Sequence, residues 1–447
     1  MENMNLQEKR SRNVAFLTLG CKVNSYETDG MKQLFIKAGY EIKEFDQQAD
    51  VYVINTCTVT NIADRKSRQM LHRAKKKNPD SIVVAVGCYV QAAKDTLEED
   101  SAIDLVIGNN KKNQIVEILE EYFGNAELRE ALVDIGEEKE FEELSIGAAG
   151  EKTRAYIKVQ DGCNQFCSYC IIPYARGRVR SRKLEEVIRE VESLVKEGYK
   201  EIVLTGIHLS SYGIDFEEDV TLLTLIQAIS RIEGLQRIRL GSLEPRIITE
   251  EFVDTLKDNP KVCPHFHLSM QSGCTETLKR MNRKYSADEF YAKCELIRSR
   301  FVAPAITTDV IVGFPGETKE EFEETKAFVQ KVAFAQMHVF KYSKRKGTKA
   351  ATMENQISEE VKHSRSIELI KIEQKMRKDY QQQFIGHKEK VLIEETVLID
   401  NITYQIGHNE RYQKLAIQTN KDLSNEVVEV LVLQTLTEEL LLCEIFN

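Results

Sequence analysis

One loop near the middle of the chain constrains the fold more than any other stretch. It spans residues 161–177 and places Cys163, Cys167 and Cys170 in the spacing C-x3-C-x2-C, directly after the strand-like run 155–160. Three thiolates are one ligand short of a tetrahedral zinc site or of a fully held [4Fe-4S] cluster. In such a cluster the fourth iron stays open to the amine and carboxylate of an amino-acid-like ligand. A zinc knuckle or unrelated buried thiols are the alternatives, and the tight spacing after a strand favours the cluster.

The composition fits a large globular chain with metal or redox chemistry. The chain has 447 residues, 42% hydrophobic and 30% charged, which suffices for two or three domains. No apolar run is long enough to span a bilayer, and residues 1–13 are too polar for a secretory segment. We therefore expect a cytoplasmic protein, in which ten cysteines indicate metal or redox chemistry rather than disulfides. Because the net charge is −9, any polyanion must be met by local basic patches.

Residues 14–110 alternate short β-rich runs with helical stretches, which predicts an α/β fold with a doubly wound parallel sheet. The expected strands are 14–19, 51–55 and 82–86, and the expected helices include 26–38 and 63–77. Each strand is followed by a cysteine, namely Cys21, Cys57 and Cys88. Ligands of open parallel sheets bind beyond the carboxyl ends of the strands, so these thiols can converge on one point. The matched placement favours a second three-thiolate cluster over three separate buried thiols.

Between the second and third of these cysteines lies a strongly basic segment, 64–77, with seven Lys or Arg residues and one acid. On a helix it forms a cationic surface beside the expected second cluster. Such a surface is typical either of a solvated face or of a nucleic-acid contact, and the segment alone leaves both readings open.

From residue 152 onward six strand-like runs alternate with helical patterns, which predicts an incomplete (β/α)6 barrel. The expected strands are 155–160, 201–205, 237–240, 265–270, 307–311 and 337–342. Chemistry belongs on the loops at the carboxyl ends of such strands. Glycine and single polar residues gather there in the loops 205–208, 241–245, 271–273 and 313–316. Glycine lets the backbone approach a ligand closely, and the polar groups suit the ribose and amino group of a cofactor.

Arginines alternate along the chain just after the cysteine loop, at Arg176, Arg178, Arg180 and Arg182. Every second side chain of an extended segment lies on one side. This predicts a row of guanidinium groups beside the cluster, suited to substrate phosphates. A salt-bridged rim of the barrel is the alternative.

The end of the chain predicts a long helix followed by a small β-barrel. Residues 358–384 lack glycine and proline, and strand-like runs follow at 391–393, 414–417, 427–433 and 440–444. Short strands of this number suggest a five-stranded barrel of the kind that binds RNA. Residues 381–447 nevertheless hold 11 acidic and 5 basic side chains. Either the few cations share one face, or this barrel docks on the protein more than on RNA.

Taken together, these motifs resemble the radical S-adenosylmethionine (SAM) methylthiotransferase family over essentially the whole chain. The resemblance implies a methylthiotransferase domain at 12–130, a linker at 131–151, a radical SAM barrel at 152–379 and a TRAM domain at 380–447. It implies that one cluster, on Cys163, Cys167 and Cys170, binds SAM and cleaves it to a 5′-deoxyadenosyl radical, and that Cys21, Cys57 and Cys88 hold an auxiliary [4Fe-4S] cluster. The loop residues expected to contact SAM are Gly206, Ser242, Glu244 and Gly313. Four further cysteines, Cys263, Cys274, Cys294 and Cys443, have no metal spacing and are expected to be structural.

The stretch 18–28, T-L-G-C-K-V-N-S-Y-E-T, resembles the branch of this family that modifies threonylcarbamoyladenosine (t6A) beside the tRNA anticodon. The isopentenyl-adenosine branch tends to have Gln-Met-Asn after the first cysteine, and the ribosomal-protein branch has Pro-Lys-Asn. The resemblance implies a methylthio group on C2 of the adenine, tRNA as substrate and flavodoxin or ferredoxin as electron donor, with the sulfur donor left open. We expect Lys22 near the substrate carboxylate, unless it forms a salt bridge or faces solvent, and Arg176, Arg178 and Arg180 near tRNA phosphates. The alternatives are methylthiolation of isopentenyl-adenosine or of a protein aspartate and, in another class, a non-catalytic iron–sulfur RNA-binding protein.

Overall fold

A computed structural model describes residues 12–93, 97, 100–147 and 153–446 of the chain. The chain divides into two compact units. The first comprises Met1–Ala149, Asp161–Asn164 and Cys170–Arg180, and the second comprises Gly150–Gln160, Gln165–Tyr169 and Ser181–Asn447. None of the helices formed by the described residues is long and apolar enough to cross a membrane.

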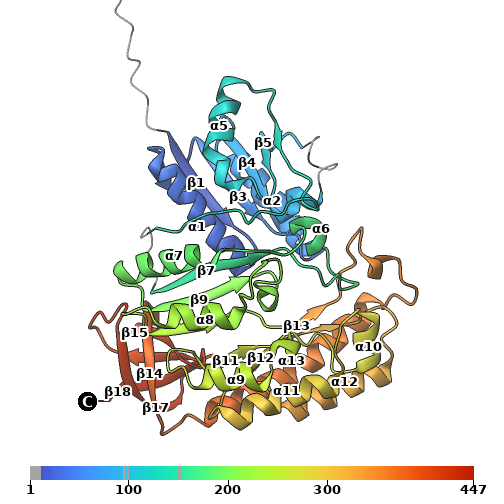
Figure 1. The fold of residues 1–447 in the computed structure, drawn as a ribbon, viewed down its shortest axis with the longest axis vertical. Coiled ribbons are helices and arrows are strands. Elements are labelled where there is room, and N and C mark those ends of the chain that lie inside the picture. Colours follow the sequence, from blue (N-terminus) through green and yellow to red (C-terminus); the bar gives the residue numbers. More distant parts are fainter. Residues whose placement is uncertain (1–11, 94–96, 98–99, 148–152, 447) are drawn as a thin grey trace, which may run out of the picture. The chain divides into compact units, whose positions relative to one another are not determined.

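The first unit is built on a six-stranded parallel sheet, which confirms the predicted doubly wound arrangement (Figure 1). Its strands, in the order β2-β1-β3-β4-β5-β6, are β1 (Asn13–Thr18), β2 (Glu41–Lys43), β3 (Val51–Thr56), β4 (Ile82–Gly87), β5 (Leu105–Ile107) and β6 (Glu130–Ala131). Its helices include α1 (Lys22–Lys37), α2 (Asn61–Lys77), α3 (Cys88–Ala92), α5 (Ile115–Gly124) and α6 (Ile172–Arg176). All six residues of β3 are buried because helices cover both faces of the sheet. Successive residues of β3, such as Val53 and Ile54, accordingly join hydrophobic clusters on opposite faces of the sheet.

The strand order reverses between β1 and β3, since β2 lies on one side of β1 and the later strands lie on the other. Parallel sheets of this order bind ligands at that reversal, beyond the carboxyl ends of the strands. The first unit therefore carries a natural ligand crevice where β1, β3 and β4 end.

The described part of the expected linker, up to residue 147, has no regular helix or strand after β6 but packs on the first unit. Ile135 and Leu144 are only 5% and 3% exposed. The carboxylate of Glu142 accepts hydrogen bonds from the backbone N–H groups of Asn110 and Asn113 at 3.2 and 3.1 Å. Glu142, one of the acidic residues of this segment, therefore holds the segment against the first unit. Residues 148–151 of the expected linker lie outside the described residues.

The second unit contains the six parallel strands predicted for an incomplete (β/α)6 barrel (Figure 1). They are β7 (Arg154–Asp161, whose last residue belongs to the first unit), β9 (Glu201–Gly206), β10 (Arg237–Leu240), β11 (His265–His267), β12 (Ala305–Val312) and β13 (Gln336–Lys341), with β8 (Arg180–Ser181) at one edge. Parallel pairing joins β7 to β9, β9 to β10, β11 to β12 and β12 to β13. Isolated parallel bridges such as Leu243 to Leu268 continue the wall from β10 to β11. The helices are α7 (Leu184–Lys196), α8 (Leu222–Ser230), α9 (Glu250–Lys257), α10 (Thr275–Arg280), α11 (Ala287–Arg300), α12 (Lys319–Val332) and α13 (Glu359–Gln382).

The second unit ends in the predicted five-stranded closed barrel, in the order β14-β15-β16-β18-β17. Its strands are β14 (Lys388–Ile399), β15 (Ile402–Asn409), β16 (Lys414–Gln418), β17 (Val427–Thr435) and β18 (Leu440–Ile445). The interior of this barrel is continuous with the larger barrel, because Ala305, Ala335 and Tyr380 join its hydrophobic cluster. One of its five cations, Arg411, pairs with Glu389 at 3.4 Å and donates to the carbonyl of Ala303 at 2.9 Å. These contacts favour the reading in which the acidic barrel docks on the protein.

Candidate functional site

Three cysteines of the first unit converge where β1, β3 and β4 end. Cys21 caps the start of α1, Cys57 follows β3 directly and Cys88 is the first residue of α3. Burial, together with the smaller effect of negative charge on Cys88 or Cys21, raises the pKa of the Cys57 thiol to about 11. The three thiols thus lie within electrostatic reach of one another, as their placement after neighbouring strands predicts.

Two glycines are required for this convergence. Gly20 has φ of +104°, and a Cβ atom there would lie 2.9 Å from the Cβ and 3.0 Å from the Sγ of Cys57. Gly87 has φ of +97°, and a Cβ atom would lie 2.9 Å from the carbonyl oxygen of Thr56. Both positions need a left-handed conformation and close backbone approach, which only glycine combines without strain. The backbone geometry therefore explains why a glycine precedes Cys21 and Cys88 in the sequence.

A fully buried arginine, Arg176, donates a hydrogen bond to one of the three thiols. Its Nε lies 3.1 Å from Cys88 Sγ, and its Nη1 donates to Glu27 at 2.8 Å and to Asp161 at 3.1 Å. Its Nη2 donates to Asn24 at 2.7 Å and to Glu27 at 3.0 Å. Burial alone lowers the pKa of this guanidinium, but the facing thiol and carboxylates outweigh burial and raise the pKa well above its usual value. Arg176 thus remains a cation that orients Cys88.

Further buried charges complete the network around Arg176. Lys112, whose side chain is wholly buried, lies 3.2 Å from Glu27 and 3.6 Å from Glu142. Arg180 lies 3.7 Å from Asp161. Three cations and three carboxylates therefore balance one another in the interior, which is the condition under which buried charge is tolerated.

The residues around the three thiols suit an iron–sulfur cluster. In the described ranges, no three His, Cys, Asp or Glu side chains are grouped as they would be around a single metal ion. A cubane cluster makes a different demand, since each thiolate binds a different iron. Three neighbouring thiols with an N–H donor at Cys88 Sγ meet that demand, because hydrogen bonds to sulfur tune such clusters. Iron bound here would also replace the protons of the Cys21 and Cys57 thiols, whose pKa values burial raises.

The alternating arginines do not form the expected row. Arg176, Arg180 and Arg182 are at most 1% exposed, and Arg182 forms an ion pair with Glu190. The premise of one extended segment fails because Arg176 ends helix α6 and Gly177 takes φ of +72°. The salt-bridged alternative therefore describes these three residues, while Arg178 is exposed. Lys22 is the first residue of α1 and is partly exposed.

The C-x3-C-x2-C loop crosses from the first unit to the second and back. Cys163 belongs to the first unit, where its backbone N–H donates to Gly177 O at 3.0 Å, and Cys170 belongs to the same unit. Cys167 belongs to the second, where Arg283 Nη1 donates to its Sγ at 3.2 Å. Neighbouring residues of the loop are held by the same segment of the barrel, since Asn282 Nδ2 donates to Phe166 O at 3.0 Å. Sequence reasoning missed Arg283, because no spacing links it to the loop.

The four residues expected to contact SAM lie at or just after the carboxyl ends of β9, β10 and β12. Gly206 ends β9, while Ser242 is exposed and Glu244 is buried in the loop after β10. The Glu244 carboxylate accepts from Arg246 Nε at 2.9 Å. Gly313 follows β12 with φ of +71°, and a Cβ atom there would lie 2.3 Å from the Lys362 side chain. The positive φ and the close packing against α13 therefore both favour glycine at position 313.

A histidine on the loop after β9 is also placed at this end of the barrel. The Nδ1 atom of His208 lies 2.6 Å from Ser211 Oγ, and its buried Nε2 has no hydrogen-bond partner among the described residues. Burial lowers the pKa of the His208 imidazole to about 4, and the positive charges of Arg283 and Arg246 add to this shift. The sequence marks this loop by Thr-Gly-Ile-His, but it does not show that the imidazole is neutral.

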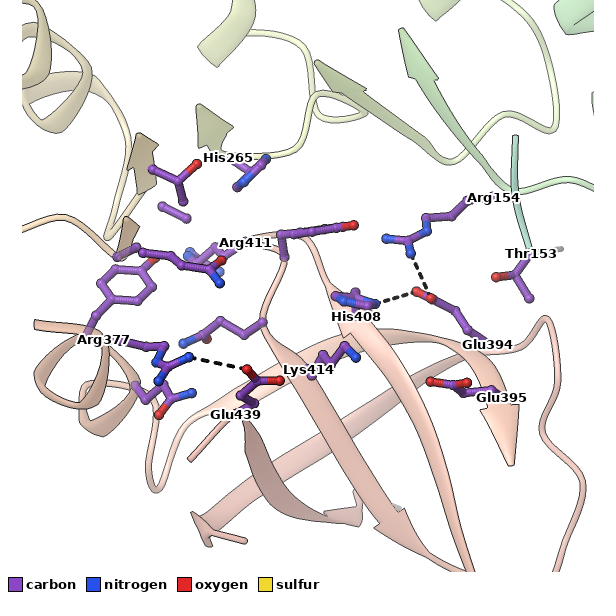
Figure 2. A pocket seen from close by; sticks show the side chains of 18 of the residues that line it. Thr153, Arg154, His265, Arg377, Glu394, Glu395, His408, Arg411, Lys414 and Glu439 are labelled. Atoms are coloured by element: carbon purple, nitrogen blue, oxygen red, sulfur yellow. Dashed lines mark hydrogen bonds and ion pairs between the residues drawn. The ribbon is translucent and has the colours of Figure 1, made fainter. Parts of the chain in front are cut away.

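A cavity in the second unit lies at the opposite ends of the barrel strands. It has a volume of about 550 Å³ and is lined by residues that begin β7, β11, β12 and β13 and by the small C-terminal barrel (Figure 2). Figure 2 shows Glu394 between Arg154 and His408, at 2.9 and 2.8 Å, and Arg377 facing Glu439 at 3.6 Å. Its cations are largely matched by carboxylates, and it is remote from the residues expected to contact SAM. We therefore assign it no part in the chemistry.

Comparisons with known proteins agree with this architecture. The profile of the radical SAM superfamily matches residues 157–329, and that of the uncharacterized protein family UPF0004 matches residues 13–108. Among solved structures, the radical SAM methyltransferase TsrM from Kitasatospora setae shares the fold at a TM-score of 0.54, with 17% identity and coverage of 74% of this chain and 73% of that one. At this identity the likeness supports the fold alone.

Curated relatives match almost the whole chain. A protein of Bacillus subtilis (strain 168) named threonylcarbamoyladenosine tRNA methylthiotransferase MtaB is 42% identical over 94% of both chains. One of the same name from Aquifex aeolicus is 42% identical over 87% of this chain and 95% of its own. A tRNA-2-methylthio-N(6)-dimethylallyladenosine synthase of Thermoanaerobacter sp. is 37% identical over 87% and 84%. The chain therefore belongs to the radical SAM tRNA methylthiotransferases, enzymes that use SAM and [4Fe-4S] clusters.

Proposed function

We propose that this enzyme attaches a methylthio group to C2 of N6-threonylcarbamoyladenosine beside the tRNA anticodon, giving 2-methylthio-N6-threonylcarbamoyladenosine. The observation that carries the proposal is the 42% identity, over 94% of both chains, to a relative named for that substrate. A relative named for dimethylallyladenosine reaches 37% over less of the chain. The residues after Cys21 support the same choice, because Lys-Val-Asn differs from the triplets of the other two branches.

Two sets of cysteines hold the clusters in this proposal. Cys163, Cys167 and Cys170 bind the cluster that receives SAM, and Cys21, Cys57 and Cys88 bind the auxiliary cluster. When bound, these groups supply radical chemistry and the transferred sulfur. The chain itself orients Cys88 through Arg176 and Cys167 through Arg283. It also excludes water around the first thiol set, since Cys57 and Cys88 are buried.

Other residues of the two units contribute binding in this proposal. Gly206, Ser242, Glu244 and Gly313 contact SAM, and Arg178 contacts a tRNA phosphate, since it is the exposed member of the arginine run. We also propose the division into segments 12–130, 131–151, 152–379 and 380–447. Flavodoxin or ferredoxin supplies the electron, and the reaction takes place in the cytoplasm.

Lys22 selects the substrate in this proposal. It follows Cys21 directly and opens helix α1, with a partly exposed side chain. The threonylcarbamoyl group ends in a carboxylate, which an ammonium group binds well. An isopentenyl group is a bare hydrocarbon and offers that ammonium no acceptor. The wrong base therefore lacks a charge-assisted contact that the threonylcarbamoyl carboxylate makes, and it is bound less tightly.

The test is reconstitution with two tRNAs, one bearing threonylcarbamoyladenosine and one bearing isopentenyl-adenosine. We expect nucleoside mass spectrometry to show a methylthio product on the first alone. Lys22→Ala should lower the rate on the first tRNA. Lys37→Ala removes an exposed charge at the other end of α1 and should leave the rate unchanged. Preferential activity on the isopentenyl tRNA would refute the proposed substrate, and a methylthio group found on ribosomal protein instead would refute tRNA as the target.

A further inference from the structure

Helix α2 carries two different kinds of positive charge. Toward its carboxyl end the cations face acids of the first unit, at Arg73–Asp46 (2.5 Å), Lys75–Asp104 (2.8 Å) and Lys77–Asp46 (3.6 Å). These pairs are the ordinary salt bridges of a solvated helix face. Apart from Lys76, which is exposed and forms no ion pair with a described residue, the lysines and arginine of this half are therefore matched by acids.

The amino-terminal half of α2 is different. Arg65 and Lys66 are exposed and form no ion pair with a described residue. Arg68 is exposed as well; it donates to the hydroxyl of Tyr89 at 2.9 Å and lies within electrostatic reach of Asp64 and Asp100. Asp64 accepts from Thr58 Oγ1 at 2.7 Å. Arg65 and Lys66 thus add positive charge to this half that no ion pair with a described residue offsets.

This charge is fixed close to Cys57. Ser67, which is fully buried, accepts from the backbone N–H of Cys57 at 3.3 Å and donates to its carbonyl oxygen at 3.1 Å. The cations at positions 65, 66 and 68 flank this serine on the helix. The hydrogen bonds therefore set their position relative to the cysteine that we assign to the auxiliary cluster.

In the sequence, two exposed aliphatic residues lie between Cys57 and the cations that begin at Arg65. Val59 is 53% exposed and Ile62 is 64% exposed. From Ile62 to Lys66 the helix rises about 6 Å, which is the scale of a single nucleotide. We define the α2 entry surface as Val59, Ile62, Arg65, Lys66 and Arg68.

We infer that the α2 entry surface binds the single-stranded RNA that flanks the base to be modified. Unpaired bases offer flat apolar faces, which suit Val59 and Ile62, and the adjoining phosphates suit the three cations. The inference rests on the proposed function, because the base must reach sulfur beside Cys57. A negatively charged electron donor is a weaker match, since electrons pass over a distance and need no aliphatic contact beside the thiol.

The test compares two double variants of the same helix in the cluster-loaded enzyme. Arg65→Ala with Lys66→Ala removes two charges from the α2 entry surface. Arg73→Ala with Lys77→Ala removes two charges that Asp46 already matches. Dissociation constants for the tRNA, measured by fluorescence anisotropy over a range of salt, give the slope of log K against log salt. We expect the first variant to lose about 1.4 units of slope, at about 0.7 per contact with single-stranded RNA, and the second to lose none.

A third variant separates apolar contact from charge. Ile62→Ser should weaken binding several-fold with the salt slope unchanged. Equal losses of slope in the two double variants would show that the helix acts on tRNA only through its long-range electrostatic field. No loss of slope in either variant would show that the helix does not contact the tRNA phosphates. Each result overturns the inference. Intact tRNA binding with impaired reduction by flavodoxin would assign the surface to the electron donor and overturn it too. Should the enzyme prefer isopentenyl tRNA, the substrate proposal fails, while the same slopes measured with that tRNA still decide this inference.

Discussion

Replacing Arg176 with methionine leaves two buried carboxylates without their shared cation. The change removes hydrogen bonds to Glu27, Asp161 and Asn24 at 2.7–3.2 Å, all in the interior. Breaking a buried ion pair by removing one partner costs about 3–5 kcal/mol. The lower end applies here, because Lys112 still faces Glu27 and Arg180 still faces Asp161. We therefore expect the first unit to lose about 3 kcal/mol of unfolding free energy.

The assay is native hydrogen exchange by mass spectrometry on the cluster-free protein, kept reduced and anaerobic so that cluster loss does not contribute. The chain has no tryptophan, so fluorescence would report poorly on one unit. Peptides from Lys22–Lys37 should exchange about 100-fold faster, since about 1.4 kcal/mol corresponds to a factor of ten. Arg178→Met, two residues away and exposed, is the matched control and should leave exchange unchanged. Equal protection in both variants would refute a stabilising role for the network.

Three further predictions concern the clusters, the RNA and pH. Changing Cys21, Cys57 and Cys88 together to alanine should leave about half of the iron, because one of two equivalent clusters remains. SAM cleavage should persist while thiolation stops. Arg178→Ala should flatten the salt dependence of tRNA binding by about one unit. The His208 pKa is lowered to about 4, so the unfolded chain, at about 6.5, binds the proton first and stability falls as pH drops from 6.5 toward 4. His208→Asn should remove about 2 kcal/mol of this loss at pH 5, measured by urea unfolding.

A specific experimental result would contradict each of these three predictions. Loss of SAM cleavage in a folded triple-cysteine variant would show that the two clusters do not act separately. A salt slope unchanged by Arg178→Ala, with unchanged affinity, would remove that residue from the RNA contact. An identical dependence of stability on pH in the wild type and the His208→Asn variant would show that the imidazole is accessible to protons in the folded state.

The strands and the convergence of the first three cysteines follow from the sequence because both depend on local periodicity. Short β-rich runs that alternate with helices specify a parallel sheet, and such a sheet brings the residues after its strands to one edge. Cys57 and Cys88 follow β3 and β4 directly, as this logic requires. The six parallel strands of the second unit are predictable for the same reason.

The burial of the arginine run was not predictable, because charge pairing is a tertiary property. Alternation at positions 176, 178, 180 and 182 looks like one face of an extended segment, but the backbone turns at Gly177. The acids that neutralise these cations, such as Glu27 and Glu190, lie far away in the sequence or on a separate helix. The same limit applies to the linker, where the acidic Glu142 closes a buried network instead of facing solvent.

The position of Arg176 implies that the two sets of cysteines are linked in folding even if they are separate in chemistry. Arg176 follows Cys170 by six residues, yet its Nε donates to Cys88 and its Nη1 to Asp161, two residues before Cys163. The segment that carries the second motif therefore completes the buried charge balance beside the first. Removing thiols leaves this balance in place, whereas removing the guanidinium breaks it. The triple-cysteine variant should consequently remain folded with its second cluster, while Arg176→Met should disturb both motifs, and iron content together with hydrogen exchange around Cys88 and Cys163 separates these outcomes.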